Sequence, residues 1–125
     1  MIKGSCWCGA VALEIDGALP PVSACHCVQC RKQSGHHWAS VHIPRGAVHV
    51  TNDDGLRWYQ SSEKVRRGFC GTCGSFLFWD PADEDKLSVS MGILQAPTGT
   101  SLAKHIFVAS KGDYYDLQDG LPQSE

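Results

Sequence analysis

The seven cysteines of this chain fall into two pairs and one cluster. They are the C-x-C pair Cys6 and Cys8, the C-x-x-C pair Cys70 and Cys73, and the C-x-C-x-x-C cluster Cys25, Cys27 and Cys30. Four thiolates complete the tetrahedral shell of a zinc ion, whereas three leave one position open to water or substrate. The spacing therefore predicts two zinc ions per chain, one that stabilises the fold and one that is able to do chemistry.

The two pairs are expected to form the closed, structural site. In Cys70-Gly71-Thr72-Cys73-Gly74, two cysteines three positions apart on a tight turn can direct both sulfurs at one ion, and the glycines permit that turn. Two such pairs would join the N-terminus to the middle of the chain. The alternative is a set of buried free thiols without metal, but paired half-sites are a much stronger signal than a lone C-x-x-C.

The cluster of three cysteines is the candidate catalytic site. Its fourth position could take water, a substrate sulfur or a histidine, with His36, His37, His42, His49 and His105 as the candidates. A metal ion deprotonates a thiol that coordinates it, so an open site of this kind suits the binding of a thiol substrate. Two alternatives stay open, namely a second structural zinc closed by a histidine and a vacant or redox-sensitive trio. His26 lies between two ligands, so its ring is expected to face away from the metal.

Basic residues lie close to the cysteines in sequence and could bind an anionic substrate. Arg31 and Lys32 follow the third cysteine of the cluster, and Arg66 and Arg67 precede the Cys70 pair. Arginine binds carboxylates through two parallel hydrogen bonds. We expect Arg31, Lys32 and Arg66 to contact the substrate, with a solvated charged surface as the alternative.

Length and charge limit the kind of protein. At 125 residues, the chain is expected to form one domain over residues 1–125. The formal charge is −2, and two thiolate-bound zinc ions would bring it to about −5, which disfavours nucleic-acid binding.

No signal-peptide pattern and no long apolar run is found, so a membrane is not an expected partner. An odd number of closely spaced cysteines favours metal binding in a reducing compartment, and we expect a cytoplasmic protein. The sequence leaves the oligomeric state open.

Short strands are expected to position these residues. β-branched and aromatic residues alternate with polar ones, and turn formers recur about every ten residues, which is typical of an antiparallel sheet protein. The predicted strands are residues 11–15, 37–43, 48–51, 56–59, 65–69, 76–79, 87–91 and 106–109. One short helix is expected near residues 27–34, and the C-terminal residues 121–125 are expected to fray.

The motifs also resemble those of a known family. Gly4 to Val11 (GSCWCGAV), Cys25 to Gly35 (CHCVQCRKQSG), Arg67 to Ser75 (RGFCGTCGS) and Lys104 to Val108 (KHIFV) are similar to the glutathione-dependent formaldehyde-activating enzymes, a family that includes centromere protein V. The resemblance covers nearly the whole chain and includes all seven cysteines. It implies an antiparallel β-tent fold, with a structural zinc on the two pairs and a catalytic zinc on the cluster.

The resemblance also implies a reaction. These enzymes are carbon–sulfur lyases that join formaldehyde to glutathione, so the expected partners are a small thiol and a small aldehyde. A zinc module that binds protein or chromatin without catalysis is the second hypothesis, and the acidic balance of the chain disfavours chromatin. A sulfoxide reductase is the third, and it is disfavoured because it needs a free cysteine beyond the metal ligands.

Overall fold

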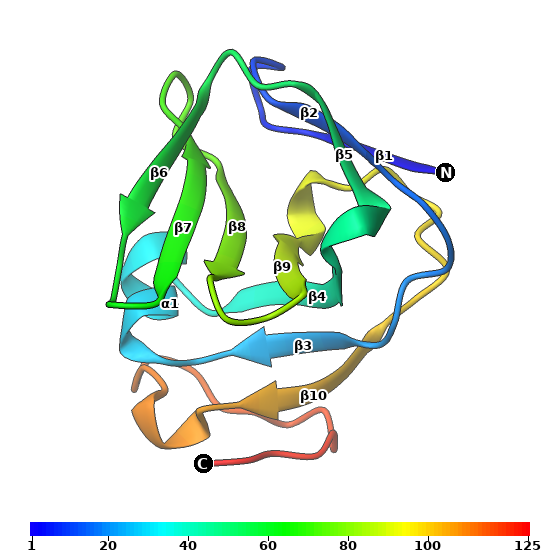
Figure 1. Cartoon of the computed structure of the whole chain (residues 1–125). Coiled ribbons are helices and arrows are strands. Elements are labelled where there is room, and N and C mark those ends of the chain that lie inside the picture. The colour runs from blue at the N-terminus through cyan, green and yellow to red at the C-terminus, as the bar shows by residue number, and fades with distance from the viewer.

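The computed structural model describes residues 1–125, which fold into two β-sheets and short helices (Figure 1). The strands are β1 (Ile2–Ser5), β2 (Ala12–Ile15), β3 (Val22–Cys25), β4 (Trp38–Pro44), β5 (Val48–Asn52), β6 (Leu56–Gln60), β7 (Val65–Cys70), β8 (Phe76–Pro81), β9 (Lys86–Ser90) and β10 (Leu102–Ile106). The helices are α1 (Val28–Ser34) and three 3-10 turns, Arg45–Ala47, Met91–Ile93 and Val108–Ser110. None of them combines the length and the hydropathy that a bilayer span requires.

The larger sheet has seven strands in the order β10-β3-β4-β9-β8-β7-β6, and the smaller one has the order β1-β2-β5. Neighbouring strands are antiparallel except for β10 and β3, which run parallel. The fold is thus mainly β and antiparallel, of the β-tent type, as predicted. Figure 1 shows that the two sheets enclose the interior, with α1 close to one end of β3 and β4.

Strand β4 shows how the sequence separates the core from the opposite face of the sheet. Val41 and Ile43 belong to the buried apolar core, and Ala39 packs against it. Trp38 and His42 point to the other face, because successive side chains in a strand alternate. That other face lines a pocket that also contains the three-cysteine cluster. One sheet therefore holds the protein together on one side and presents functional groups on the other.

Helix α1 begins and ends close to where the sequence places it. The Cys27 side chain accepts a hydrogen bond from the Cys30 backbone N–H at the start of the helix. Gly35 ends the helix at φ 84°, a conformation that glycine adopts without a steric penalty. Cys30 is the buried residue of the helix, so α1 presents a cysteine to the interior.

Two strands were not predicted, and one was misplaced. β1 and β3 have only four residues each and contain small residues such as Gly4 and Ala24, which give a weak strand signal. The strand expected at residues 106–109 is β10, which ends at Ile106. Phe107 stops it there, because its φ of 56° lies in the left-handed region.

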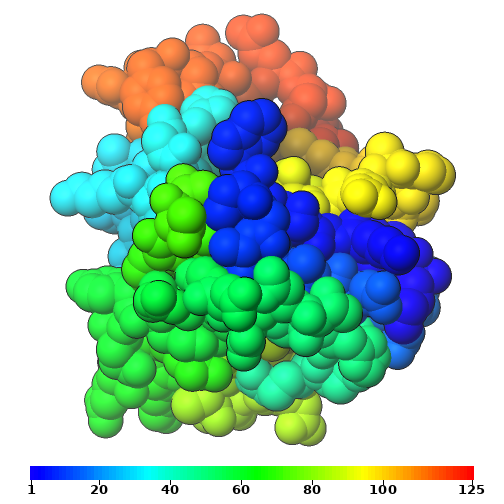
Figure 2. All heavy atoms as spheres, turned by 90° about the horizontal axis from the view of Figure 1, so that it is seen from above, coloured from blue at the N-terminus to red at the C-terminus, as the bar shows by residue number.

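The expectation that residues 121–125 fray is wrong. The His105 backbone N–H donates to the Pro122 carbonyl at 2.9 Å, and the Ser124 N–H donates back to the His105 carbonyl at 3.0 Å. The Val108 N–H also donates to the Ser124 carbonyl. These bonds hold the end of the chain along the free edge of β10. Figure 2 shows the orange residues that precede this segment beside the cyan residues around α1, while the blue N-terminal residues pack against the green middle of the chain.

Candidate metal centres and active-site pocket

The four-cysteine group comes together as the sequence predicts. The sulfurs of Cys6, Cys8, Cys70 and Cys73 all lie within 4.8 Å of one another, so the group could hold a metal ion. The Cys8 sulfur is 3.7 Å from that of Cys6 and 3.8 Å from that of Cys70. The group joins the loop after β1 to the end of β7. A metal ion there would connect two segments that are otherwise distant in sequence.

Backbone and hydroxyl donors surround these sulfurs. The Val11 N–H donates to the Cys6 sulfur at 3.3 Å, and the Cys73 N–H donates to the Cys70 sulfur at 3.5 Å. Hydrogen bonds from the side chain and backbone of Ser75 lower the pKa of Cys73 to about 5. Donors to sulfur favour the thiolate, which is the form that binds metal. The donor set therefore fits a cation.

The three-cysteine cluster forms at the junction of β3 and α1. Cys25 ends β3, Cys27 caps α1 and Cys30 lies in the first turn of α1, and their sulfurs are also within 4.8 Å of one another. The pKa of Cys25 is lowered, first by a hydrogen bond from Cys30, and the pKa of Cys30 is raised by the same bond and by burial. Sulfurs close enough to share a proton in this way could instead share a metal ion. No histidine belongs to the group, so the structure gives no support to a site closed by a histidine.

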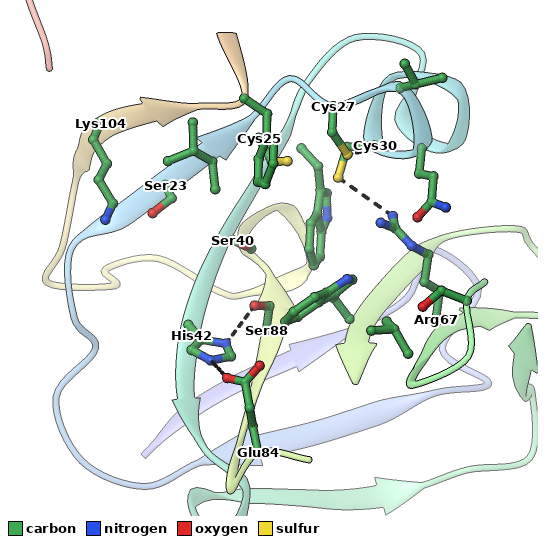
Figure 3. A pocket seen from close by; sticks show the side chains of 18 residues that line it. Ser23, Cys25, Cys27, Cys30, Ser40, His42, Arg67, Glu84, Ser88 and Lys104 are labelled. Carbon is green, nitrogen blue, oxygen red and sulfur yellow. Dashed lines mark hydrogen bonds and ion pairs between the residues drawn. The ribbon is translucent and has the colours of Figure 1, made fainter. Parts of the chain in front are cut away.

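A pocket of about 710 Å³ opens beside this cluster (Figure 3). Its apolar and aromatic walls include Trp38, Trp79, Ile106 and Phe107. Its polar lining comes from Ser23, Ser40, His42, Arg67, Glu84, Ser88 and Lys104. Ligand-binding pockets commonly combine apolar walls with a few polar groups. Here the three sulfurs line the same cavity as both kinds of group.

Arg67 is hydrogen-bonded to the cluster. Its Nη1 donates to the Cys30 sulfur at 3.7 Å and to Gln33 Oε1 at 3.2 Å, although the residue is only 4% exposed. Its Nε is buried without a partner. A buried guanidinium with an unused donor beside a pocket is suited to bind a carboxylate or carbonyl oxygen. In the sequence, Arg67 was one of the basic residues before the Cys70 pair and the first residue of the RGFCGTCGS motif, but Arg66 was expected to contact the substrate instead.

The basic residues named as substrate contacts lie elsewhere around the site. Arg66 Nε donates to Asp80 at 2.8 Å, and its guanidinium stacks on Trp58 at 3.7 Å. Lys32 lines a second cavity, of about 580 Å³, which Arg67 also lines. Arg31 is partly buried, and its Nε has no hydrogen-bond partner. None of the three lines the larger pocket, and their roles in substrate binding stay predictions.

One of the six histidines lines the pocket. His42 lines the pocket and hydrogen-bonds to Ser88 at 3.0 Å and to Glu84 at 3.0 Å (Figure 3). His26 and His105 hydrogen-bond to each other and do not line the pocket. The ring of His26 therefore faces away from the three sulfurs, as expected. Lys104 was part of the KHIFV motif but was not named as a site residue, and Glu84 had no motif to indicate it, because only the folding of the sheet brings the two to the cavity.

Comparison with known proteins shows the family of this chain. The family model for glutathione-dependent formaldehyde-activating enzymes matches residues 1–110. The chain belongs to this family. It is similar to an uncharacterized lyase of Schizosaccharomyces pombe, with 23% identity over 116 residues that cover 92% of this chain and 84% of the relative. Its fold is similar to that of a Rhodobacter sphaeroides protein, with a TM-score of 0.64 and 20% identity over 97% of this chain and 98% of the other.

Membership of the family supports a lyase that acts on formaldehyde. It also agrees with glutathione and formaldehyde, or molecules like them, as the small-molecule partners. The family match ends at residue 110, so residues 111–125 lie outside it. All seven cysteines lie within the match.

Proposed function

We propose that the chain is a zinc-dependent carbon–sulfur lyase that adds a small thiol, glutathione or a similar molecule, to formaldehyde or a related small aldehyde. One observation carries the proposal. The three sulfurs of Cys25, Cys27 and Cys30 meet within 4.8 Å, and all three line a cavity of about 710 Å³. A site that only stabilised the fold would need no such cavity beside its ligands.

The two cysteine groups would divide the roles of structure and catalysis. The four-cysteine group offers a complete tetrahedral donor set and would hold a structural zinc. The three-cysteine group offers an incomplete set, and a zinc ion bound there would lower the pKa of a thiol substrate and so supply its thiolate at neutral pH.

The reaction is a simple addition of a thiol to a carbonyl group, and the protein need lower its barrier only modestly. The thiol loses its proton, a carbon–sulfur bond forms as the carbonyl π bond opens, and the former carbonyl oxygen takes up one proton. The pocket would hold the two reactants together, so that an encounter in solution becomes a reaction between neighbours. Trp38, Trp79 and Ile106 line the pocket, and their apolar surfaces would displace water from around the bound reactants.

Charged residues around the pocket would orient the thiol. Arg67 and Lys104 line the cavity, as Figure 3 shows, and could bind carboxylates of the thiol. Arg31, Lys32 and Arg66 stay candidates for contacts at the rim. Cys25, Cys27 and Cys30 would be the catalytic centre, because they alone would hold the ion that activates the thiol.

The test is a formaldehyde–glutathione assay on the wild type and on Cys27→Ser, with zinc measured in both proteins. We expect two zinc ions and a rate above the uncatalysed reaction for the wild type. Cys27→Ser should fold, keep one zinc and show the uncatalysed rate. Equal rates for both proteins, at the level of buffer alone, would reject the proposal.

A further inference from the structure

A chain of hydrogen bonds runs beneath the three-cysteine loop, on the side away from the pocket. His26 Nδ1 lies 2.5 Å from the hydroxyl of Tyr115, and His26 Nε2 lies 2.9 Å from His105 Nδ1. His105 Nε2 lies 2.7 Å from the carboxylate of Asp119. The proposed reaction uses none of these four residues.

The Asp119 carboxylate determines which atom donates and which accepts in each hydrogen bond of the series. A carboxylate only accepts hydrogen bonds, so Nε2 of His105 carries a proton and its Nδ1 accepts. The proton between the two rings then belongs to Nε2 of His26, which leaves Nδ1 of His26 to accept from the Tyr115 hydroxyl. Every donor in the chain therefore faces an acceptor, and each ring is held in one tautomer.

His26 connects this chain directly to two metal ligands. It lies between Cys25 and Cys27 in sequence, and its side chain is completely buried. Its backbone N–H donates to the Ile106 carbonyl of β10 at 3.0 Å. Because both ring nitrogens and the backbone N–H have partners, the peptide that joins the two cysteines has little freedom to rotate.

The residues at both ends of the hydrogen-bond chain, Tyr115 and Asp119, belong to residues 111–125, the segment outside the family match. Lys111 holds Tyr115 in place, because its ammonium donates to the Tyr115 carbonyl and lies 4.5 Å from the centre of the Tyr115 ring. Asp119 also accepts from the Leu121 N–H at 3.0 Å. Figure 2 shows this segment next to the residues around α1.

We propose that residues 111–125 act as a clamp that positions the three-cysteine loop, with Tyr115 and Asp119 holding His26 through the hydrogen-bond chain. Partners that orient metal ligands in this way typically change metal affinity by 10–100-fold when they are removed. The inference rests on a metal at the three-cysteine site but not on the lyase reaction. The four-cysteine group lies at the end of β7, toward the other edge of the sheet, and serves as an internal reference.

The test uses the full chain with both sites loaded with zinc, and it measures the affinity of each site by competition with a chelator. The Cys27→Ser variant identifies the signal of the four-cysteine site. Tyr115→Phe keeps the ring and removes the hydroxyl that donates to His26. Tyr114→Phe makes the same change on the exposed neighbour and is the matched control. We expect Tyr115→Phe to weaken zinc binding at the three-cysteine site by about tenfold or more, and Tyr114→Phe to leave it unchanged.

Substitutions of Asp119 test the other end of the hydrogen-bond chain independently. Asp119→Ala should weaken the three-cysteine site selectively, and Asp119→Asn should restore most of the affinity because its amide oxygen still accepts from His105. Nitrogen NMR should show a proton on Nε2 of both His26 and His105 in the wild type and a mixture of tautomers in Asp119→Ala. Asp116→Asn is the control in the same segment.

Three results would overturn the clamp. Equal weakening of both zinc sites would mean only a general loss of stability, and unchanged affinity at both sites would mean that the contacts do not position the loop. If the wild type binds only one zinc ion, the three-cysteine group holds no metal, and both the clamp and the proposed function are rejected. The first two results, obtained with a wild type that binds two zinc ions, would overturn the clamp alone.

Discussion

Arg67 donates a hydrogen bond from Nη1 to the sulfur of Cys30, across 3.7 Å, from a position that is almost completely buried. This contact connects the middle of β7 to the first turn of α1. It places a permanent positive charge beside a sulfur that is expected to be ionised when a metal is bound. A charge-assisted hydrogen bond of this kind is about twice as strong as a neutral one.

Replacing Arg67 should therefore destabilise the protein and the cluster together. Arg67→Met keeps most of the apolar volume and removes the hydrogen bonds to Cys30 and Gln33. We expect a loss of about 2 kcal/mol in the free energy of unfolding, because hydrogen bonds to charged groups contribute about 1.5–3 kcal/mol. Urea denaturation of the zinc-loaded wild type and variant measures this loss.

The control is the same change at the adjacent position. Arg66 is exposed, and its partner Asp80 keeps a second ion pair with Arg45. Arg66→Met should cost about 1 kcal/mol or less, because Arg66 is about half exposed and the buried Asp80 keeps its ion pair with Arg45. Equal losses for the two variants would contradict the role given to Arg67.

Gly55→Ala should disturb the four-cysteine site through a steric clash. A Cβ at Gly55 would lie 2.8 Å from the Ala10 Cβ and 2.9 Å from the Cys70 sulfur. The Gly55 backbone cannot easily move away, since its N–H donates to Ala10 and its carbonyl accepts from Gly71. We expect a loss of about 1–3 kcal/mol in stability and weaker zinc binding at this site.

Gly46→Ala provides the comparison for that change. A Cβ at Gly46 meets no atom within 4 Å, and its φ lies outside the left-handed region. We expect the stability and zinc affinity of this variant to match the wild type in the same denaturation and chelator experiments. A stable Gly55→Ala variant with normal zinc affinity would show that the Cys70 loop relaxes.

His37 should make stability depend on pH. Its pKa is lowered from the ordinary value, first by burial and then by repulsion from His36 and His105. Below about pH 6.5, the unfolded chain therefore binds a proton that the folded chain resists, and stability falls as the pH falls. His37→Asn should reduce the loss of stability between pH 7.5 and pH 5. Zinc content is measured at both pH values, since any acid release of zinc should affect both proteins equally. Identical pH dependence in the two proteins would count against this prediction.

Ser90 stabilises the wall of the pocket through two hydrogen bonds. The indole N–H of Trp38 donates to Ser90 Oγ at 2.6 Å, and the Ser90 hydroxyl donates to the Phe76 carbonyl at 2.7 Å. Ser90→Ala leaves the buried indole N–H without a partner, which should cost about 1–3 kcal/mol. Ser40 faces Ser90 across the β4–β9 pair and takes part in neither of these two hydrogen bonds, so Ser40→Ala is the control. A thermal denaturation series would show whether Ser90→Ala is the more destabilised variant.

Most strands of the fold could be predicted from the sequence because each has its own pattern. The segment 37–43 alternates in the way that a strand with two different faces requires, and β4 follows it closely. β3 could not be found in this way. It is a short run of small residues, and its position is set by pairing with β4 and with the distant β10.

The sequence by itself determined the grouping of the cysteines. A C-x-x-C turn brings two sulfurs together through local geometry, so Cys70 and Cys73 are neighbours in any fold that keeps that turn. What tertiary structure alone decided is which side chains surround those sulfurs. Arg66 and Arg67 are adjacent and chemically identical, but strand alternation and the packing of β7 turn one toward Trp58 and the other toward Cys30. Tyr115 reaches His26 across 89 positions of sequence. No local pattern encodes such a contact, because it depends on how distant segments pack.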